Sequence, residues 1–453
     1  MHPHAPDLSA PKIATGMMVI YGLPYMAYAI AALPLALFVP SYYADDMALP
    51  LAAVGIAIAA SRIFDVIIDP FIGILSDSWN TRWGRRKPWI AAGAPLFMLS
   101  LWMIFAPPPG VTFEYLLGWT CLFFISFTLV DLPYKAWGAE LSTDYSERSR
   151  VTAWREAFGF AGQLVLVLVL MLLESLGQRE PATQLRAIAL TVILTLPPLL
   201  IVAFKTVPER PPDTLAGEWP RGTAGLMLVA RNPAFVRMVI SVVLFVSGLI
   251  VQATLHKIVL VHVTETPDLF ASMLLLENIA TIALVPLWIR ISDRIGKHRA
   301  LCLAALWAGL WSLLLPFHGQ GDGWPLIGVL AIRGSSFASI LFLANSIAAD
   351  VVDHDTVTSG RQRTGLYFAI WAMTYKFAIA LGVLLATVLP AYFGFEPADA
   401  STHTPSFEFA LMAVYGWLPG VLMALGALFL WNFPIDQTRQ RALRALITQR
   451  ALD

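Results

Sequence analysis

Three charged residues lie close together inside a long apolar segment of the sequence. Arg62, Asp65 and Asp69 occur within residues 60–70, which are otherwise mostly apolar. On a helix with about 100° per residue, the three side chains fall within an arc of roughly 60°. A charge in bilayer hydrocarbon is costly and is kept where it is paired or contacts water or an ion. The pattern therefore predicts a cation-binding face on a membrane-spanning helix.

The composition supports placing this segment in a membrane. Of the 453 residues, 58% are hydrophobic and 13% are charged, and the mean hydropathy is +0.69. Soluble domains average about 45–50% apolar and 25% charged residues. The formal net charge of zero argues against a nucleic-acid partner held by bulk electrostatics. We predict a membrane protein with several spans.

Hydropathy windows of about 20 residues predict twelve membrane-spanning helices. Their ranges are 13–40, 49–76, 89–107, 112–139, 151–174, 184–205, 234–257, 268–291, 299–317, 324–349, 364–391 and 408–432. A polar, proline-rich connector separates the sixth span from the seventh. We expect an all-α membrane protein with a six-helix bundle over 1–205, a cytoplasmic linker over 206–233, a second bundle over 234–432 and a basic cytoplasmic tail over 433–453.

Lysine and arginine predict the orientation of these helices. If the N-terminus is cytoplasmic, the inner segments hold 21 of these residues and the outer segments hold 3. Cytoplasmic loops normally carry the excess of positive charge. We therefore expect a multi-pass protein of the plasma (inner) membrane with both termini in the cytoplasm.

Two loops at equivalent places in the predicted halves share a pattern. In each, an acid closes a helix, a glycine turn follows and a basic cluster ends the loop: Asp77, Gly84, Arg85 and Arg86 in the first, and Asp293, Gly296 and Arg299 in the second. This pattern suits an interhelix charge clamp that acts in gating, although ordinary positive-inside decoration is the alternative. Parallel six-span halves with such loops resemble the major facilitator superfamily, whose substrate site lies near mid-membrane between the halves.

Within that superfamily the chain resembles the glycoside–pentoside–hexuronide:cation symporter family, the melibiose-permease-like group. The resemblance covers essentially the whole chain and is carried by Arg62 through Gly73, Trp83 through Trp89, Asp131 through Tyr134, Glu140 through Arg155, and Lys376. In relatives, two acids of the second helix bind the coupling cation together with an acid and a threonine of the fourth. The resemblance implies this role for Asp65, Asp69, Asp131 and Thr128.

The implied cation is sodium or a proton. Hard cations take oxygen ligands, and crowded carboxylates favour proton uptake by one of them. Sodium-using relatives often carry asparagine just before the second acid, where this chain has Ile68. The missing oxygen ligand favours a proton. We expect no cofactor, and no metal apart from possible sodium at this site.

Toward the middle of the apolar spans, five basic residues stand against five acidic ones, as paired charges in a protein-lined cavity would: Arg62, Lys135, Arg155, Arg333 and Lys376 against Asp65, Asp69, Asp131, Glu156 and Glu277. The resemblance implies that Arg155 and Lys376 contact a sugar or connect its site to the cation site. Four aromatic residues could stack on such a solute, with helix packing as the alternative: Tyr25, Tyr28, Trp154 and Trp371. We interpret Arg62, Glu156, Glu277 and Arg333 as a charge network, with interhelix braces as the alternative.

The solute is left open. Sugar-binding relatives use an acid in the first helix, and the span from Ile13 to Pro40 has none. The retained basic residues fit a hexuronide or other anion, whereas the missing acid fits a lipid-like solute, as in the related lysolipid carriers. A membrane-embedded enzyme is the distant alternative. The HExxH, GxSxG and GxxxxGK[ST] motifs, which would support an enzyme or an ATP-driven pump, are absent. We expect a monomeric cation-coupled symporter of a sugar, glycoside or hexuronide, not an enzyme.

Overall fold

The computed structural model describes residues 13–32, 34–78, 81–142, 145–209, 231–359, 364–399, 401 and 403–434. The helices in the first part of the chain are α1 (Thr15–Ala32), α2 (Pro34–Leu37), α3 (Val39–Asp45), α4 (Leu51–Ser78), α5 (Lys87–Phe105), α6 (Phe113–Glu140), α7 (Tyr145–Ser175) and α8 (Pro181–Thr206). Those in the second part are α10 (Pro233–His262), η1 (Pro267–Leu269), α11 (Phe270–Ala283), α12 (Val285–Ile295), α13 (Lys297–Ser312), η2 (Leu315–Phe317), α14 (Gly323–Gly334), α15 (Phe337–Ser359), α16 (Thr364–Tyr392) and α17 (Pro405–Trp431).

Twelve stretches of the described chain are long and apolar enough to cross a membrane, which confirms the predicted all-α, twelve-span fold. The seventh shows one clear difference, because it continues to His262 rather than ending near Lys257. Both His256 and Lys257 are buried within the fold, so their polarity does not mark the end of the span. Many large apolar side chains are exposed, among them Leu194 and Leu428. Such a surface suits contact with lipid tails.

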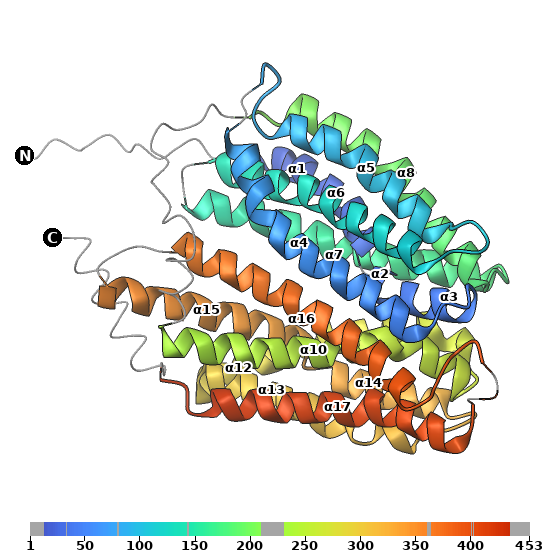
Figure 1. Ribbon diagram of the computed structural model, residues 1–453. Coiled ribbons are helices and arrows are strands. Elements are labelled where there is room, and N and C mark those ends of the chain that lie inside the picture. Colours follow the sequence, from blue (N-terminus) through green and yellow to red (C-terminus); the bar gives the residue numbers. More distant parts are fainter. Residues whose placement is uncertain are drawn as a thin grey trace, which may run out of the picture. The chain divides into compact units, whose positions relative to one another are not determined.

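Contacts divide the chain into two units, and the first comprises residues 1–39 and 64–216. Within it, α1 packs on α7 and α8, and α5 packs on α6 and α8; Figure 1 shows α5 beside α8. Two tyrosines join α1 to α6: the Tyr21 hydroxyl donates to the Tyr134 carbonyl at 2.9 Å, and the Tyr134 hydroxyl donates to the Tyr21 carbonyl. Their rings stack with centroids 4.9 Å apart. These contacts fix the helix pair that carries Tyr25, Tyr28 and Asp131 of the candidate site.

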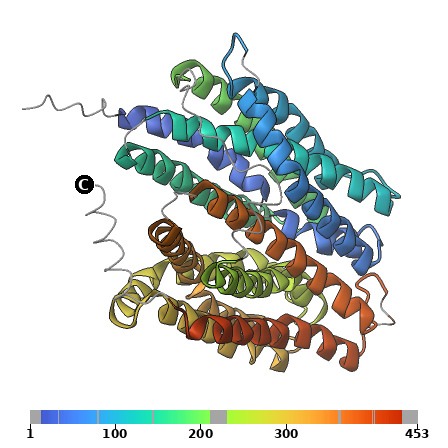
Figure 2. The same ribbon diagram turned by 60° about the vertical axis from the view of Figure 1, so that its left-hand side comes forward.

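The second unit comprises residues 40–63 and 217–453. Here α10 packs on α16 and α17, and α13 packs on α17; Figure 2 shows α10 in green beside α17 in red. The first turns of α4 belong to this unit, since Gly55 lies against Thr387 of α16 and the Leu51 N–H donates to Glu396 Oε2 at 3.0 Å. Contacts thus group residues 40–63 differently from the contiguous bundle 1–205 of the sequence prediction. Most of the predicted linker and tail lies outside the described residues.

Two spans of the second unit are broken helices. The eighth span breaks at Leu284, between α11 and α12, and the tenth breaks at Ser335 and Ser336, between α14 and α15. The breaks pack on each other, because Thr281 Oγ1 donates to the Gly334 carbonyl at 2.8 Å and Trp288 Nε1 donates to the Ser335 carbonyl at 3.1 Å. Irregular backbone at membrane depth is tolerated where protein groups satisfy it.

Candidate cation and substrate site

A carboxylate–hydroxyl cluster joins α4 to α6 in the first unit. Asp65 and Asp69 lie one turn apart on α4, and Thr128 of α6 reaches both. Thr128 Oγ1 is 2.7 Å from Asp65 Oδ1 and 2.8 Å from Asp69 Oδ1. Asp65 and Thr128 are buried. The structure therefore brings together three of the four residues predicted for the cation.

The two contacts of Thr128 limit the protonation of this cluster. A threonine hydroxyl has one hydrogen and can donate to one carboxylate at a time. The second close approach is favourable when the other carboxyl is protonated and donates to Oγ1, or when a cation lies between the oxygens. The geometry therefore suits one proton or one small hard cation shared by Asp65, Asp69 and Thr128.

The fourth predicted residue, Asp131, forms an ion pair with Lys135. Lys135 Nζ lies 2.7 Å from Asp131 Oδ2, and the two residues occupy positions i and i+4 of α6. The sequence analysis left Lys135 out of the site, although this spacing places two side chains side by side on a helix. Asp131 thus carries its own counter-charge.

A small hollow lies between α1, α6 and α8 next to this ion pair. Its lining residues are Pro24, Tyr25, Tyr28, Val130, Asp131, Tyr134, Leu196 and Leu200. The Tyr28 hydroxyl donates to the Phe127 carbonyl at 2.7 Å, and the Tyr28 ring stacks on the Phe127 ring with centroids 4.4 Å apart. Two of the predicted substrate residues, Tyr25 and Tyr28, thus line one hollow with an acid from α6.

Arg155 of α7 adds a positive charge to the aromatic wall. Its guanidinium carbon lies 5.3 Å from the centre of the Tyr25 ring, within the range of a cation–π contact. Its Nη2 also pairs with Glu156 Oε1 at 2.5 Å. The structure thus joins Arg155, Glu156 and Tyr25, which the sequence analysis assigned to the substrate site and the charge network.

The remaining predicted substrate residues are less closely connected. Trp154 packs on Phe158 with ring centroids 6.1 Å apart. Trp371 is buried in the core of the second unit, and its Nε1 donates to Asn345 Oδ1 at 2.7 Å, so packing accounts for its position. Lys376 lies half-buried on α16 in the second unit, whereas Arg155 belongs to the first.

The first predicted gating loop forms a clamp around two acids. Arg85 Nη2 and Arg86 Nη2 lie 2.6 and 2.7 Å from Glu140 Oε1 at the end of α6. Gly84 has φ +110°, and the N–H groups of Arg85 and Arg86 both donate to Glu209 Oε1 at 2.5 Å. Only the backbone of Asp77 is described, in the last turn of α4.

The second gating loop uses a different basic residue from those predicted. Gly296 has φ +89° between α12 and α13. Lys297 Nζ pairs with Asp350 Oδ2 of α15 at 2.6 Å. Asp293 and Arg299 are both exposed. The sequence pattern located this turn but missed the Lys297–Asp350 pair, whose partners are 53 residues apart.

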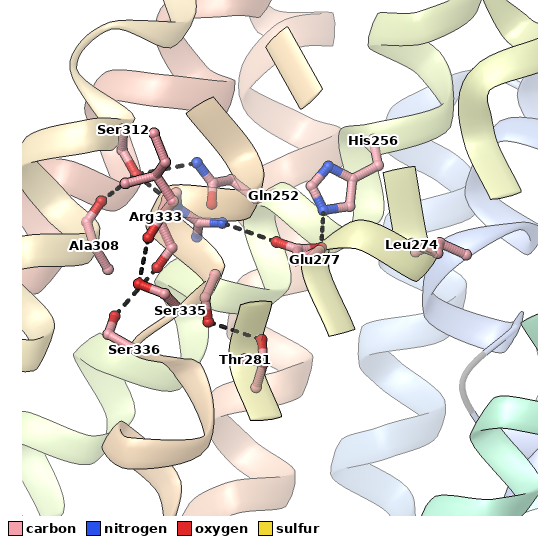
Figure 3. Close-up of polar contacts among 12 residues, drawn as sticks. Gln252, His256, Leu274, Glu277, Thr281, Ala308, Ser312, Arg333, Ser335 and Ser336 are labelled. Atoms are coloured by element: carbon pink, nitrogen blue, oxygen red, sulfur yellow. Dashed lines mark hydrogen bonds and ion pairs between the residues drawn. The ribbon is translucent and has the colours of Figure 1, made fainter. Parts of the chain in front are cut away.

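Glu277 and Arg333, the other pair of the predicted charge network, lie together in the second unit (Figure 3). Their closest charged atoms are 3.6 Å apart, and His256 lies beside the same carboxylate. The sequence analysis did not single out His256. Arg62 lies on α4 one turn before Asp65.

Comparison with known proteins identifies the class to which this fold and site belong. A sequence profile described as MFS/sugar transport protein matches residues 20–437. The chain belongs to this transporter family. It is similar to the glucuronide carrier protein homolog of Escherichia coli (strain K12), with 24% identity over 441 residues that cover 92% of this chain and 91% of the relative.

Two further comparisons broaden this result. The sodium-dependent lysophosphatidylcholine symporter 1 of Homo sapiens is 24% identical over 429 residues, which cover 86% of this chain and 78% of that protein. The crystal structure of the nucleoside transporter NupG has a TM-score of 0.68 at 12% identity and covers 93% of this chain and 100% of that one. The structural likeness supports the major facilitator fold alone. The protein is therefore an integral, multi-pass membrane transporter.

Proposed function

We propose that the protein is a cation-coupled symporter that moves a sugar, glycoside or hexuronide across the membrane by alternating access. The observation that carries this proposal is the position of Thr128 Oγ1 between Asp65 and Asp69. A buried and a partly buried carboxylate that share one hydroxyl gain stability when a cation or proton joins them. A membrane transporter with such a site can couple that uptake to the movement of a solute.

Coupling follows from the electrostatics of the cluster. With no cation, the charges of Asp65 and Asp69 oppose enclosure in a medium of low dielectric constant. A bound cation relieves that repulsion, and the solute then binds beside Tyr25 and Arg155. Rocking of the two six-helix bundles about the site would release both ligands on the other side. Each ligand thus becomes a requirement for the transport of the other.

A hexuronide or glycoside is the solute class that we favour. Tyr25 and Tyr28 line the hollow and give it an aromatic wall for a sugar, and the Arg155 guanidinium offers a charge for a carboxylate. The similarity to a glucuronide carrier protein homolog supports this choice. A lipid-like solute is the second candidate, because the chain is also similar to a lysophosphatidylcholine symporter and lacks an acid in its first span.

We favour a proton as the coupling cation, since Ile68 stands where a further oxygen ligand would help sodium. The proposal also places the chain in the plasma (inner) membrane with both termini in the cytoplasm. Its partners are the lipid bilayer, the solute and the cation, and one chain suffices for transport.

The proposal is tested by uptake into vesicles that contain the purified protein. Glucuronides, neutral glycosides and lysolipids are offered separately, each with an inward sodium gradient, an inward proton gradient or neither. We expect gradient-driven accumulation of a glucuronide or glycoside. Accumulation of lysolipids alone would favour the second candidate, and equilibration without accumulation in every condition would contradict symport.

A further inference from the structure

Three ionisable side chains from three helices meet inside the second unit. Arg333 of α14 is 0% exposed, and Glu277 of α11 and His256 of α10 are 9% and 2% exposed. Arg333 Nη1 lies 3.6 Å from Glu277 Oε1, and His256 Nε2 lies 3.6 Å from Glu277 Oε2. The two oxygens of one carboxylate therefore face two different basic groups (Figure 3).

The far sides of both basic groups are held in place. Arg333 Nε donates to Ser312 Oγ at 2.8 Å, and the guanidinium lies 4.4 Å from the centre of the Phe337 ring. His256 Nδ1 is 2.7 Å from the Tyr415 hydroxyl. Both distances from Glu277 are longer than a hydrogen bond. A small movement of the Glu277 carboxylate would therefore let it form a hydrogen bond with either Arg333 or His256.

Some polar atoms of this cluster do not form hydrogen bonds. Within the described residues, Glu277 Oε1 and both Nη atoms of Arg333 are buried without a hydrogen-bond partner. Buried charges in that condition are expensive, so a structural brace would be expected to pair them more closely. Ionisable residues held inside a membrane at such a cost are functional candidates.

The cluster also lies where the backbone is irregular. Arg333 is the second-last residue of α14, and α11 ends six residues after Glu277. Gly334 allows the close approach, because a Cβ there would lie 2.6 Å from Glu277 Cγ. Discontinuous membrane helices are where transporters commonly place their ligand sites.

We propose that Glu277 and His256 form a second proton-binding site, with one proton held between Glu277 Oε2 and His256 Nε2. The proton comes from water and reaches Glu277 first, because this side chain has the most exposure of the three. The carboxyl O–H then donates to the Nε2 lone pair, while Nδ1–H donates to the Tyr415 hydroxyl. One proton is gained, no other bond changes, and the net charge of the cluster rises from zero to +1.

A proton fits this site better than a metal cation. Sodium needs several oxygen ligands, whereas the one carboxylate here lies beside the fixed charge of Arg333. Lys257, the residue after His256 on α10, has its Nζ over the Phe270 ring at 5.9 Å. The charged residues of the packed helices α12 and α15 begin at Arg290 and Asp350, which are three or more turns along the chain. Glu277 is the acid that the structure pairs with Arg333.

Protonation of this pair would weaken its attraction for Arg333. The contact between α11 and α14 would then loosen at the two helix breaks. The site therefore provides a second proton that influences the conformation of this half, in addition to the cation of the Asp65–Asp69–Thr128 cluster. This inference rests on the proposed function for its role in transport but not for proton binding itself.

The test is infrared difference spectroscopy of the purified full-length protein between pH 9 and pH 5. We expect a carboxyl or imidazole band that titrates in the wild type, disappears in Glu277→Gln and moves by about one pH unit in His256→Gln. Glu114→Gln, at the exposed start of α6, is the matched control and should keep the band. If Glu277→Gln shows the same titrating bands as the wild type, the proposal is overturned.

If Glu277→Gln folds poorly, a second variant, Glu277→Asp, still tests the proposal. Glu277→Asp keeps the acid but moves it away from His256, so its band should titrate at a different pH. An unchanged band in Glu277→Asp would likewise overturn the proposal. The spectroscopic measurement needs no solute. If the band titrates as expected but the protein shows no symport, the proposed function fails and the proton site stands. If symport is observed but the band is missing, the proton site fails and the proposed function stands.

Discussion

The buried polar groups of the two units differ in the signs of their charges. In the first unit, two carboxylates of one helix share the hydroxyl of Thr128. In the second, a carboxylate lies between a guanidinium and an imidazole from two other helices. An acid-rich site gains from any small cation, whereas a balanced site must give up its own ion pair to accept one. The first is suited to coupling by a cation, and the second admits only a proton.

The largest effect is expected at the acid-rich site. Asp65→Asn or Asp69→Asn should abolish gradient-driven accumulation, since either change removes a charge that the cation neutralises. Folding and membrane insertion should be nearly unaffected, because asparagine can still hydrogen-bond to Thr128. The measurement is solute uptake by vesicles beside a thermal unfolding curve of the same preparation.

The control for these variants is Glu114→Gln, which also removes one acid from a span and should leave uptake unchanged. Normal active uptake by Asp65→Asn or Asp69→Asn would reassign the acids. They would then be structural partners of Arg62, and the contrast between the two polar groups would lose its functional meaning.

The next effect concerns stability in the second unit. Arg333→Met should lower the free energy of unfolding by about 3–5 kcal/mol, because Glu277 is left buried with an uncompensated charge. The double variant Arg333→Met with Glu277→Met should recover most of this loss. Denaturant unfolding in detergent measures both.

Lys135→Met is the matched comparison from the first unit. The Lys135 side chain is 42% exposed, so its pair with Asp131 is less enclosed than Arg333, and its removal should cost less, about 0.2–1 kcal/mol. Equal losses for Arg333→Met and Lys135→Met would show that the loss of Arg333 destabilises the protein no more than the loss of a less enclosed ion pair.

The sequence predicted the fold better than it predicted the partners of charged residues. Twelve apolar runs and the i, i+4 acids of α4 can be recognised because each is a local pattern. The Glu277–His256–Arg333 cluster depends on contacts between residues far apart in the chain, and no local pattern selects His256 from eight histidines. The helix breaks at Leu284 and Ser335 also escape hydropathy, since both spans stay apolar across them.

A smaller effect is expected at the clamp of the first unit. Gly84 has φ +110°, and a Cβ there would lie 2.1 Å from Glu209 Oε2. Gly84→Ala should therefore add backbone strain of about 1–3 kcal/mol and displace Glu209 from the N–H groups of Arg85 and Arg86. We expect slower exchange between inward-open and outward-open states at unchanged solute affinity.

Solute exchange and equilibrium binding measure these two quantities separately for Gly84→Ala. Gly110→Ala is the control, because Gly110 also has positive φ but a Cβ there would meet nothing within 4 Å. Loss of binding with a normal exchange rate in Gly84→Ala would contradict the gating role.

The smallest effect is the choice of cation at the acid-rich site. Sodium would have carboxylate oxygens and Thr128 as ligands but no amide at position 68, which is isoleucine, so its binding should suffer more than that of a proton. Uptake should therefore rise as the external pH falls and depend only weakly on sodium. Ile68→Asn should shift this balance toward sodium, and Ile68→Leu is the matched control that should not. Uptake that ignores pH but responds strongly to millimolar sodium would disprove proton coupling, yet the acid-rich site would still be the place where the cation binds.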